Sequence, residues 1–165
     1  MKKTRTVFKH FLIAPILFLA IFTCRAQEED IIIKGKVSIV YDGDTYLINT
    51  SDNQEIKVRL LHIDCPEKDQ PYGAEAKYYA ESRIKGRNVI VYIKDYDQYD
   101  RALGLVMEEN GSVFNYELLT LGYAWHYAKY SDDLAASALQ QFAKESSTGL
   151  WAFPNPIAPW NYRNQ

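Results

Sequence analysis

Short apolar stretches separated by polar turns make up the part of the chain that follows residue 30. Apolar and polar positions alternate through 31–40, 45–49 and 55–63, which predicts three strands in succession. Thr, Ser, Asp and Asn at 50–53 form a polar turn between the second strand and the third. Within 56–61 the alternation gives way to a continuous apolar run. That run indicates a strand that is buried on both faces or bent by a bulge, as small closed barrels require.

Helical periodicity follows the third strand and returns near the end of the chain. Apolar residues at helical spacing predict a helix over 76–84, and Gly86 supplies the left-handed stop that helix ends favour. Two further helices are expected over 115–121 and 132–147. The residues expected to bound them are Gly122 and Gly149 at their C-terminal ends and Ser131 or Asp132 as the N-cap of the longer one.

Two more strands, over 89–94 and 103–108, bring the expected number to five, with a polar and aromatic loop at 95–101 between them. The tail at 151–162 contains three prolines and cannot be helical throughout, and its Trp side chains are expected to pack over the barrel that the strands form. Five strands with one helix after the third and helices at the end predict an α+β fold. The expected architecture is a five-stranded, partly open Greek-key barrel of the OB type with about three helices, forming one domain over 27–165.

The first 26 residues have the pattern of an export signal. Basic residues at 2–9 precede an apolar run at 11–22, and small side chains favour cleavage after Ala26. One alternative is a lipoprotein in which Cys24 is acylated and becomes the mature N-terminus. Another is a retained membrane anchor, although about a dozen apolar residues is short against the roughly 20 that a spanning helix needs. The expected location is therefore periplasmic or secreted, with a membrane-anchored lipoprotein as the alternative.

Charge and composition narrow the chemistry. The formal net charge is −2, and cleavage after Ala26 would remove five basic residues and no acidic one, leaving 14 Lys and Arg against 21 Asp and Glu, a net charge of −7. This balance argues against a protein that holds nucleic acid by neutralising many phosphates. Two Cys and three His are too few for a disulfide framework or a conventional zinc cluster. The candidate chemistry therefore depends on carboxylates, Arg and Tyr.

Three short segments concentrate charge within apolar surroundings. Residues 42–45 read Asp-Gly-Asp-Thr, 59–67 read Arg-Leu-Leu-His-Ile-Asp-Cys-Pro-Glu, and 97–101 read Asp-Gln-Tyr-Asp-Arg. Asp-Gly is also a common hairpin turn, so the first segment alone is weak. An Arg in an apolar strand needs an anion, and a buried ion pair of Arg59 with one acid is the plain structural explanation. If the segments meet, the remaining carboxylates repel unless a cation lies among them, and oxygen ligands favour Ca²⁺ or Mg²⁺.

In this order and spacing, the three segments closely resemble the staphylococcal-nuclease-like, or thermonuclease, family in its exported bacterial form. The resemblance covers about residues 34–151 and extends to Leu-Gly-Tyr-Ala-Trp at 121–125 and Thr-Gly-Leu-Trp at 148–151. It implies an OB-fold with a Ca²⁺-dependent phosphodiesterase site that cleaves DNA and RNA with little sequence preference and leaves 3′-phosphate ends. No stable protein partner is implied.

The resemblance also assigns roles by position. Arg59 and Arg101 match the pair that grips the phosphate, and Glu67 matches the acid usually assigned to activating water. Asp44, Asp64 and the backbone carbonyl of Cys65 match the calcium ligands. The supporting residues that match are Asp42 and Thr45. The candidate substrate contacts are Tyr99, Tyr130 and Tyr127, for each of which ordinary packing is an equal alternative.

Asp100 departs from the family pattern, which has Gly at this position. Asp tolerates a left-handed backbone better than most residues, but its charge would be able to pair with Arg101 and weaken the hold on phosphate. His62 and His126 lack partners at ligand spacing and are expected to be structural. The alternative function is a noncatalytic OB-type module that binds nucleic acid or protein. The sequence leaves the preference for DNA or RNA, the biological role and the oligomeric state open.

Overall fold

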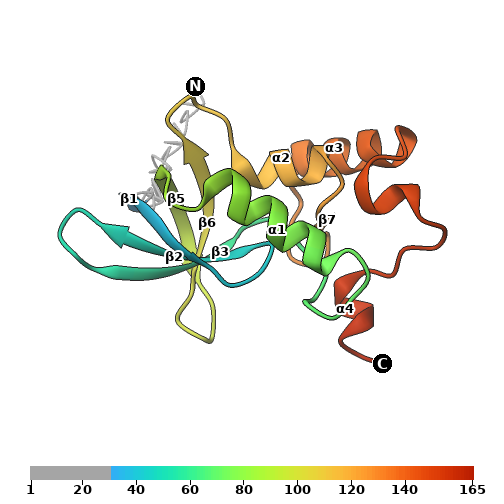
Figure 1. Ribbon diagram of the computed structural model, residues 1–165, viewed down its shortest axis with the longest axis horizontal. Coiled ribbons are helices and arrows are strands. Elements are labelled where there is room, and N and C mark those ends of the chain that lie inside the picture. The colour runs from blue at the N-terminus through green and yellow to red at the C-terminus, as the bar shows by residue number, and fades with distance from the viewer. Residues whose placement is uncertain (1–30) are drawn as a thin grey trace, which may run out of the picture.

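A closed five-stranded barrel forms one half of the molecule (Figure 1). The computed structural model describes residues 31–165, so the expected export signal at 1–26 lies outside the described residues. Around the barrel the strands run in the order β1 (Ile31–Val40), β2 (Thr45–Thr50), β3 (Glu55–Leu60), β6 (Ala102–Glu108) and β5 (Asn88–Tyr96). The α+β OB-fold prediction is confirmed.

The long first strand closes this barrel. Its first half, from Ile31 to Lys36, pairs antiparallel with β5, and its second half, from Gly35 to Val40, pairs antiparallel with β2. The ring is completed by a parallel pairing of β3 with β6. The barrel is therefore closed, and the expectation of a partly open one was wrong, because one strand is long enough to serve two neighbours.

The predicted third strand at 55–63 breaks in two. β3 ends at Leu60, and His62 then takes a left-handed backbone with φ 70°. The chain continues as β4 (Ile63–Asp64), which pairs outside the barrel with β7 (Trp125–His126). The apolar run at 56–61 thus reflects a strand that leaves the barrel, and the break turns the backbone before Asp64.

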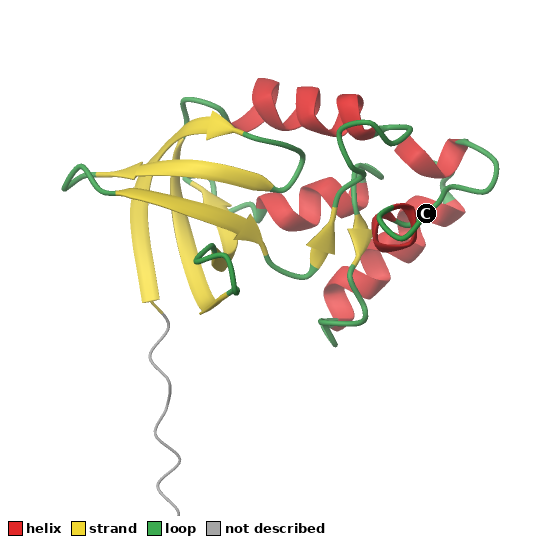
Figure 2. Cartoon of the chain, turned by 90° about the horizontal axis from the view of Figure 1, so that it is seen from below, coloured by secondary structure: helices red, strands yellow, loops and turns green. Residues whose placement is uncertain are grey.

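Residues 31–165 also form four α-helices and one 3₁₀ helix, more than the three or so expected: α1 (Gly73–Ile84), α2 (Phe114–Thr120), α3 (Leu134–Glu145), η1 (Gly149–Ala152) and α4 (Pro159–Tyr162). As Figure 2 shows, they lie along and beyond one side of the barrel. The left-handed stops are confirmed at Gly86 and Gly122, but α3 ends before Gly149: Ser147, with φ 50°, is the left-handed residue after it, and Gly149 begins η1. The N-cap prediction for α3 was wrong, because Asp133 accepts the capping hydrogen bond from the Ala136 N–H at 2.6 Å.

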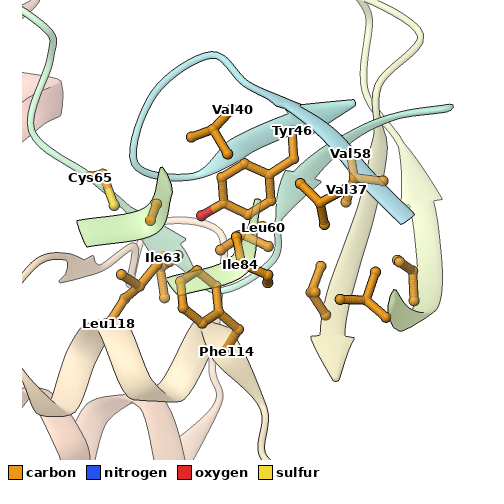
Figure 3. Packing of buried hydrophobic residues seen from close by; sticks show 14 of the residues in the cluster. Val37, Val40, Tyr46, Val58, Leu60, Ile63, Cys65, Ile84, Phe114 and Leu118 are labelled. Atoms are coloured by element: carbon orange, nitrogen blue, oxygen red, sulfur yellow. The ribbon is translucent and has the colours of Figure 1, made fainter. Parts of the chain in front are cut away.

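The core fills the space between the barrel and the helices (Figure 3). Val37, Val58 and Tyr46 contribute from the strands, and Phe114 and Leu118 contribute from α2, all at most 1% exposed. Burying a side chain of this size stabilises a fold by about 1.5–3 kcal/mol. The site end of the barrel is therefore built on a rigid base.

The tail packs away from the barrel, so its predicted position was wrong. Trp151 and Trp160 lie against Trp125 of β7, with ring centroids 4.4 and 5.7 Å apart. They pack there because β7 lies outside the barrel and presents the indole of Trp125. No helix within residues 31–165 is both long and apolar enough to cross a membrane.

Candidate active site

Strand pairing brings the three charged segments together at one end of the barrel. The β2–β3 pairing sets Thr45 opposite Arg59, and the β3–β6 pairing sets Arg59 opposite Leu103, just after the 97–101 loop. The result is a polar cavity of about 420 Å³. Its lining contains Asp42, Asp44, Thr45, Arg59, Asp64, Cys65, Pro66, Glu67, Tyr99, Arg101, Tyr127 and Arg163. The sequence-predicted catalytic, metal and supporting residues therefore share one cavity, while their roles stay predictions.

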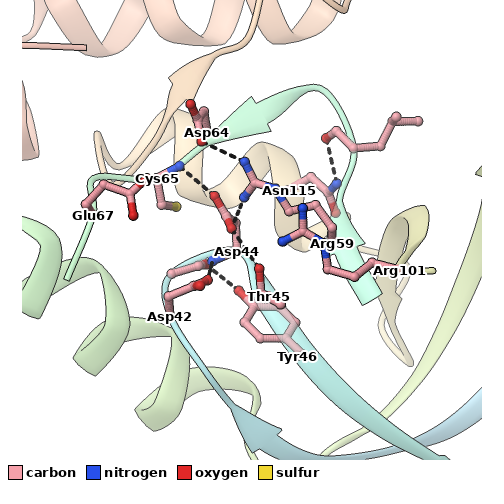
Figure 4. A network of polar contacts seen from close by, with 12 residues as sticks. Asp42, Asp44, Thr45, Tyr46, Arg59, Asp64, Cys65, Glu67, Arg101 and Asn115 are labelled. Atoms are coloured by element: carbon pink, nitrogen blue, oxygen red, sulfur yellow. Dashed lines mark hydrogen bonds and ion pairs between the residues drawn. The ribbon is translucent and has the colours of Figure 1, made fainter. Parts of the chain in front are cut away.

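Arg59 lies at the centre of this cavity (Figure 4). Its side chain is 14% exposed and forms ion pairs with Asp44 and, at 2.6 Å, with Asp64. Both carboxylates are buried, so each would be costly without a cationic partner. The plain structural explanation, a buried ion pair of Arg59, is therefore present, and it accounts for two of the acids rather than one.

The hairpin after β1 is held against the segment that follows β4. The Cys65 N–H donates to Asp44 Oδ2 at 2.7 Å, and the Asp44 N–H donates to Asp42 Oδ1 at 3.0 Å. Gly43 permits this approach, because a Cβ there would lie 2.8 Å from the Cβ of Cys65. Burial raises the pKa of Asp42 against the opposing pull of Arg59. Asp44 is thus fixed in direction by backbone contacts as well as by charge.

Arg101 reaches the cavity from the loop before β6. Its Nε and Nη2 donate to Asp97 Oδ2 at 2.7 and 2.6 Å. Partial burial opposes ionisation of Asp97, but the hydrogen bonds from Arg101 outweigh it and lower the pKa of that carboxyl. Asp100 takes the left-handed backbone, φ 60°, that a Gly in its place would allow. Asp100 is exposed, so the acid that holds Arg101 is Asp97 and not Asp100.

Glu67 lies at the rim, on the loop between β4 and α1. Its backbone N–H donates to Gln70 Oε1 at 3.0 Å, and Gln70 Nε2 in turn donates to the Ile157 carbonyl at 2.7 Å. Gly73 allows α1 to start close by, since a Cβ there would lie 1.8 Å from the Glu67 carbonyl oxygen. The loop that carries Glu67 is therefore tied both to α1 and to the C-terminal tail.

Arg163 is a site residue that the sequence did not indicate. It follows α4 and extends its guanidinium to Asp64 Oδ2 at 2.8 Å and to Glu67 Oε1 at 2.5 Å. The hydrogen bond to Asp64 is the largest cause of a raised pKa of Arg163. A single Arg in a polar tail, 99 residues from Asp64, carries no local pattern that would have identified it.

Asn115 is a second residue that the sequence did not single out. It is fully buried on α2, where its Oδ1 accepts from the Val106 N–H at 2.9 Å. Its Nδ2 donates to the carbonyls of Leu61 at 2.9 Å and Gly104 at 3.1 Å. It therefore satisfies the backbone at the point where β3 ends. A polar residue within an apolar helical stretch was the available signal.

The predicted tyrosines divide between two hollows. Tyr99, 70% exposed, and Tyr127 line the cavity that holds the acids. Tyr130 does not line it, but lies in a neighbouring hollow of about 210 Å³ that shares Arg59, Arg101 and Tyr127. Tyr130 meets Tyr127 edge-on, with centroids 4.8 Å apart. Tyr127 thus connects two hollows that are both lined by Arg59 and Arg101.

Comparison with known proteins agrees with this geometry. Residues 57–153 match the family model described as staphylococcal nuclease homologue. The chain belongs to this family. An uncharacterized endonuclease of Escherichia coli is 35% identical over 81% of the chain and 86% of its own length, and one of Haemophilus influenzae is 34% identical over 95% and 86%. The probable staphylococcal-like nuclease CAN1 of Oryza sativa subsp. japonica is 34% identical over 67% of the chain and 33% of its own length.

The donor chemistry of this nuclease-family cavity fits a hard divalent cation. Asp44, Asp64 and the Cys65 carbonyl would supply oxygen ligands of the kind that Ca²⁺ prefers. Within residues 31–165 no three Asp, Glu, His or Cys side chains converge as a ready-made metal site. The guanidiniums of Arg59 and Arg163 hold the oxygens of these carboxylates.

The two histidines lie behind the site, in a hydrogen-bonded group centred on Ser131. The Ser131 hydroxyl lies 2.9 Å from His62 Nδ1 and 3.0 Å from His126 Nε2, and His62 Nε2 lies 3.8 Å from Asp133. Burial lowers the pKa of both imidazoles. This group links the break after β3 to β7 and to the start of α3. The prediction that both histidines are structural is consistent with these contacts.

Proposed function

We propose that this protein is a Ca²⁺-dependent nuclease that hydrolyses phosphodiester bonds in DNA and RNA with little sequence preference and leaves 3′-phosphate ends. The observation that carries the proposal is the meeting of Arg59, Arg101 and Glu67 with the buried acids Asp44 and Asp64 in one cavity. Membership of the staphylococcal nuclease homologue family and the endonuclease names of its relatives support it.

The residues can divide the reaction between them. Arg59 and Arg101 present forked N–H donors, which stabilise the charge that accumulates on the nonbridging phosphate oxygens. Glu67 accepts a proton from the attacking water while the new P–O bond forms and the bond to the 5′ oxygen breaks. The 5′ oxygen takes up a proton from solvent water and leaves as a hydroxyl group, and Glu67 then returns its own proton to solvent, so that one water is consumed in total. A bound Ca²⁺, held by Asp44, Asp64 and the Cys65 carbonyl, would neutralise phosphate charge and bring the water close.

A digestion assay with calcium titration tests the activity. Full-length protein should degrade single-stranded DNA and RNA when Ca²⁺ is added and stop when a chelator is added, and end-group analysis should find 3′ phosphates. Cleavage that ignores the chelator, or no cleavage at any Ca²⁺ concentration, contradicts the proposal. Tight oligonucleotide binding without cleavage would instead favour the noncatalytic OB-type module.

We also propose export, on the basis of the basic and apolar pattern of residues 2–22. Mass spectrometry of protein recovered from the periplasm or medium should give a mature N-terminus at Gln27. A lipid-modified N-terminus at Cys24 would show the lipoprotein alternative, and an intact Met1 would contradict export by cleavage.

A further inference from the structure

Several contacts fix α4 and hold Arg163 at the cavity. Trp160 stacks on Tyr127, with ring centroids 5.2 Å apart and planes 9° from parallel. The Tyr162 hydroxyl donates to the Asp69 carbonyl at 3.1 Å, which ties the end of α4 to the loop that carries Glu67. Pro159 is buried at the start of the helix. The position of Arg163 is therefore set by the packing of the helix that precedes it and not by its charge alone.

The guanidinium of Arg163 occupies the carboxylate oxygens that a cation would need. Its Nη2 lies 2.8 Å from Asp64 Oδ2, and its Nη1 lies 3.3 Å from Asp64 Oδ1. Arg59 Nη2 takes the same Oδ1 at 2.6 Å. Asp64 is 1% exposed, so solvent does not supply alternative partners for it. Both oxygens of this carboxylate are thus engaged by arginine N–H groups.

The guanidinium of Arg163 also binds the carboxylate of Glu67. Its Nη1 lies 2.5 Å from Glu67 Oε1, so one guanidinium bridges an expected metal ligand and the expected base. Arg163 is 40% exposed at its side chain, whereas Arg59 is 14% exposed. Of the two guanidiniums on Asp64, Arg163 has the easier route to solvent. It is the group that can leave.

We infer that Arg163 competes with the divalent cation for Asp64, so that cation binding requires its guanidinium to release Asp64 and Glu67. This inference rests on the proposed function, because it concerns the cation of the same site. Release of Arg163 would do two things at once. It would return a carboxylate oxygen to the cation and free Glu67 to accept a proton from water. The tail would then act as a built-in competitor that sets how much Ca²⁺ the site needs.

Calcium titration of full-length protein by calorimetry tests this directly. Arg163→Gln should lower the Ca²⁺ dissociation constant by about five- to thirtyfold, the factor that corresponds to a partly exposed, forked ion pair worth about 1–2 kcal/mol. Arg163→Lys should give an intermediate value, because Lys keeps the charge but cannot fork. Arg87→Gln is the matched control, since it removes the same charge from an exposed residue in a different hollow.

Thermal melts separate competition from a merely structural role. In chelator, Arg163→Gln should melt about 3–8 °C below the wild type, because Asp64 and Glu67 lose a partner, and saturating Ca²⁺ should remove the difference. If the wild type binds Ca²⁺ and Arg163→Gln binds it equally or less tightly, the inference fails while the proposed function stands. An unchanged Ca²⁺ constant together with weaker oligonucleotide binding would make Arg163 a phosphate contact instead and overturn it. If neither protein binds Ca²⁺, both proposals fail.

Discussion

At the scale of single residues, the two expected phosphate-binding arginines differ in how deeply their carboxylate partners are buried. Arg59 neutralises Asp44 and Asp64, whose side chains are 5% and 1% exposed. Arg101 pairs with Asp97 at the edge of the cavity, where the side chains are 25% and 17% exposed. Removing Arg59 leaves buried charge behind, whereas removing Arg101 leaves a carboxylate that water can reach. Arg59 is thus supported by two buried ion pairs and Arg101 by one accessible ion pair.

Arg59→Ala and Arg101→Ala should therefore agree in activity and differ in stability. Each should lower turnover by at least about a hundredfold, the scale of losing one donor to the transition state. Arg59→Ala should also lower the free energy of unfolding by about 3 kcal/mol, while Arg101→Ala should cost under about 1 kcal/mol. Urea unfolding alongside a digestion assay measures both quantities. Near-normal rates in either variant would remove the role assigned to that arginine, and equal stability losses would contradict the burial argument.

The histidine group predicts how stability depends on pH. The pKa values of His62 and His126 are lowered by burial from an ordinary value of 6.5. Between the lowered values and 6.5 the unfolded chain binds more protons, so stability falls as the pH drops below about 6.5. Burial opposes ionisation of Asp133, but the hydrogen bond from the Ala136 N–H helps to lower the pKa of that carboxyl below 3.8. Asp133 therefore changes the stability only at a more acidic pH than the histidines do.

Melting temperatures measured from pH 7.5 to pH 5.5 should thus decrease for the wild type. His62→Asn should show a shallower decrease, because Asn tolerates the left-handed backbone at this position and does not titrate. A melting temperature that is flat across this range would contradict the prediction.

The role of a residue was predictable from the sequence where its side chain does not suit its local surroundings. An Arg inside an apolar strand requires an anion, and this conflict identifies Arg59 from the sequence alone. Asp97 offered no such conflict, and its hold on Arg101 depends on a turn whose shape the sequence does not state. Arg163 lies in a polar tail where a charge costs nothing, so only the folded chain shows its partners.

At the scale of elements, the break after β3 sets the direction of the site. Leu61 and His62 separate a barrel strand from β4, and Asp64 faces the cavity because β4 pairs outside the barrel. The backbone at the break remains satisfied because Asn115 donates to the Leu61 carbonyl. One amide on α2 therefore supports the position of a carboxylate that it does not touch.

Asn115→Ala should remove the partner of the half-buried Leu61 carbonyl and of the buried Val106 N–H, while the Gly104 carbonyl keeps its hydrogen bond from the Leu61 N–H. We expect a loss of about 2–4 kcal/mol in unfolding free energy, because each unsatisfied buried group costs about 1–3 kcal/mol and some relax. Activity should also fall, as the break loosens. Asn88→Ala, at an exposed strand end, is the control and should change stability by less than about 0.5 kcal/mol. A loss that small in Asn115→Ala would show that the amide is dispensable.

The elements themselves followed from periodicity to within a few residues, as with β2 and α2. The break in the predicted strand at 55–63 did not, because an apolar run is equally compatible with a strand buried on both faces and with one that leaves its sheet. The way in which the barrel closes was not predicted either, because closure depends on β1 pairing with both β2 and β5. Both features are decided by long-range pairing, which local periodicity does not encode.

At the scale of the whole molecule, the net charge of the chain opposes the binding of a polyanion, whereas the two arginines of the cavity favour it. The chain carries a formal net charge of −2, which does not attract a polyanion over long distances. Arg59 and Arg101 nevertheless face one cavity from different strands and loops. The proposed nuclease thus grips the phosphate locally, and the barrel fixes the grip in advance.

A local grip has a measurable signature in the dependence of activity on salt. Because both arginines hold the same phosphate, neutralising this one phosphate of a single strand should give a slope of about −0.7 for the logarithm of kcat/KM against the logarithm of salt concentration. Between 50 and 200 mM salt this amounts to about a threefold loss, whereas a protein that neutralises six phosphates of a single strand loses about three-hundredfold. The assay uses single-stranded DNA at constant, saturating Ca²⁺. A slope of about −4 or steeper would show that a basic surface beyond the two arginines takes part, because counterions are released only where phosphates are neutralised.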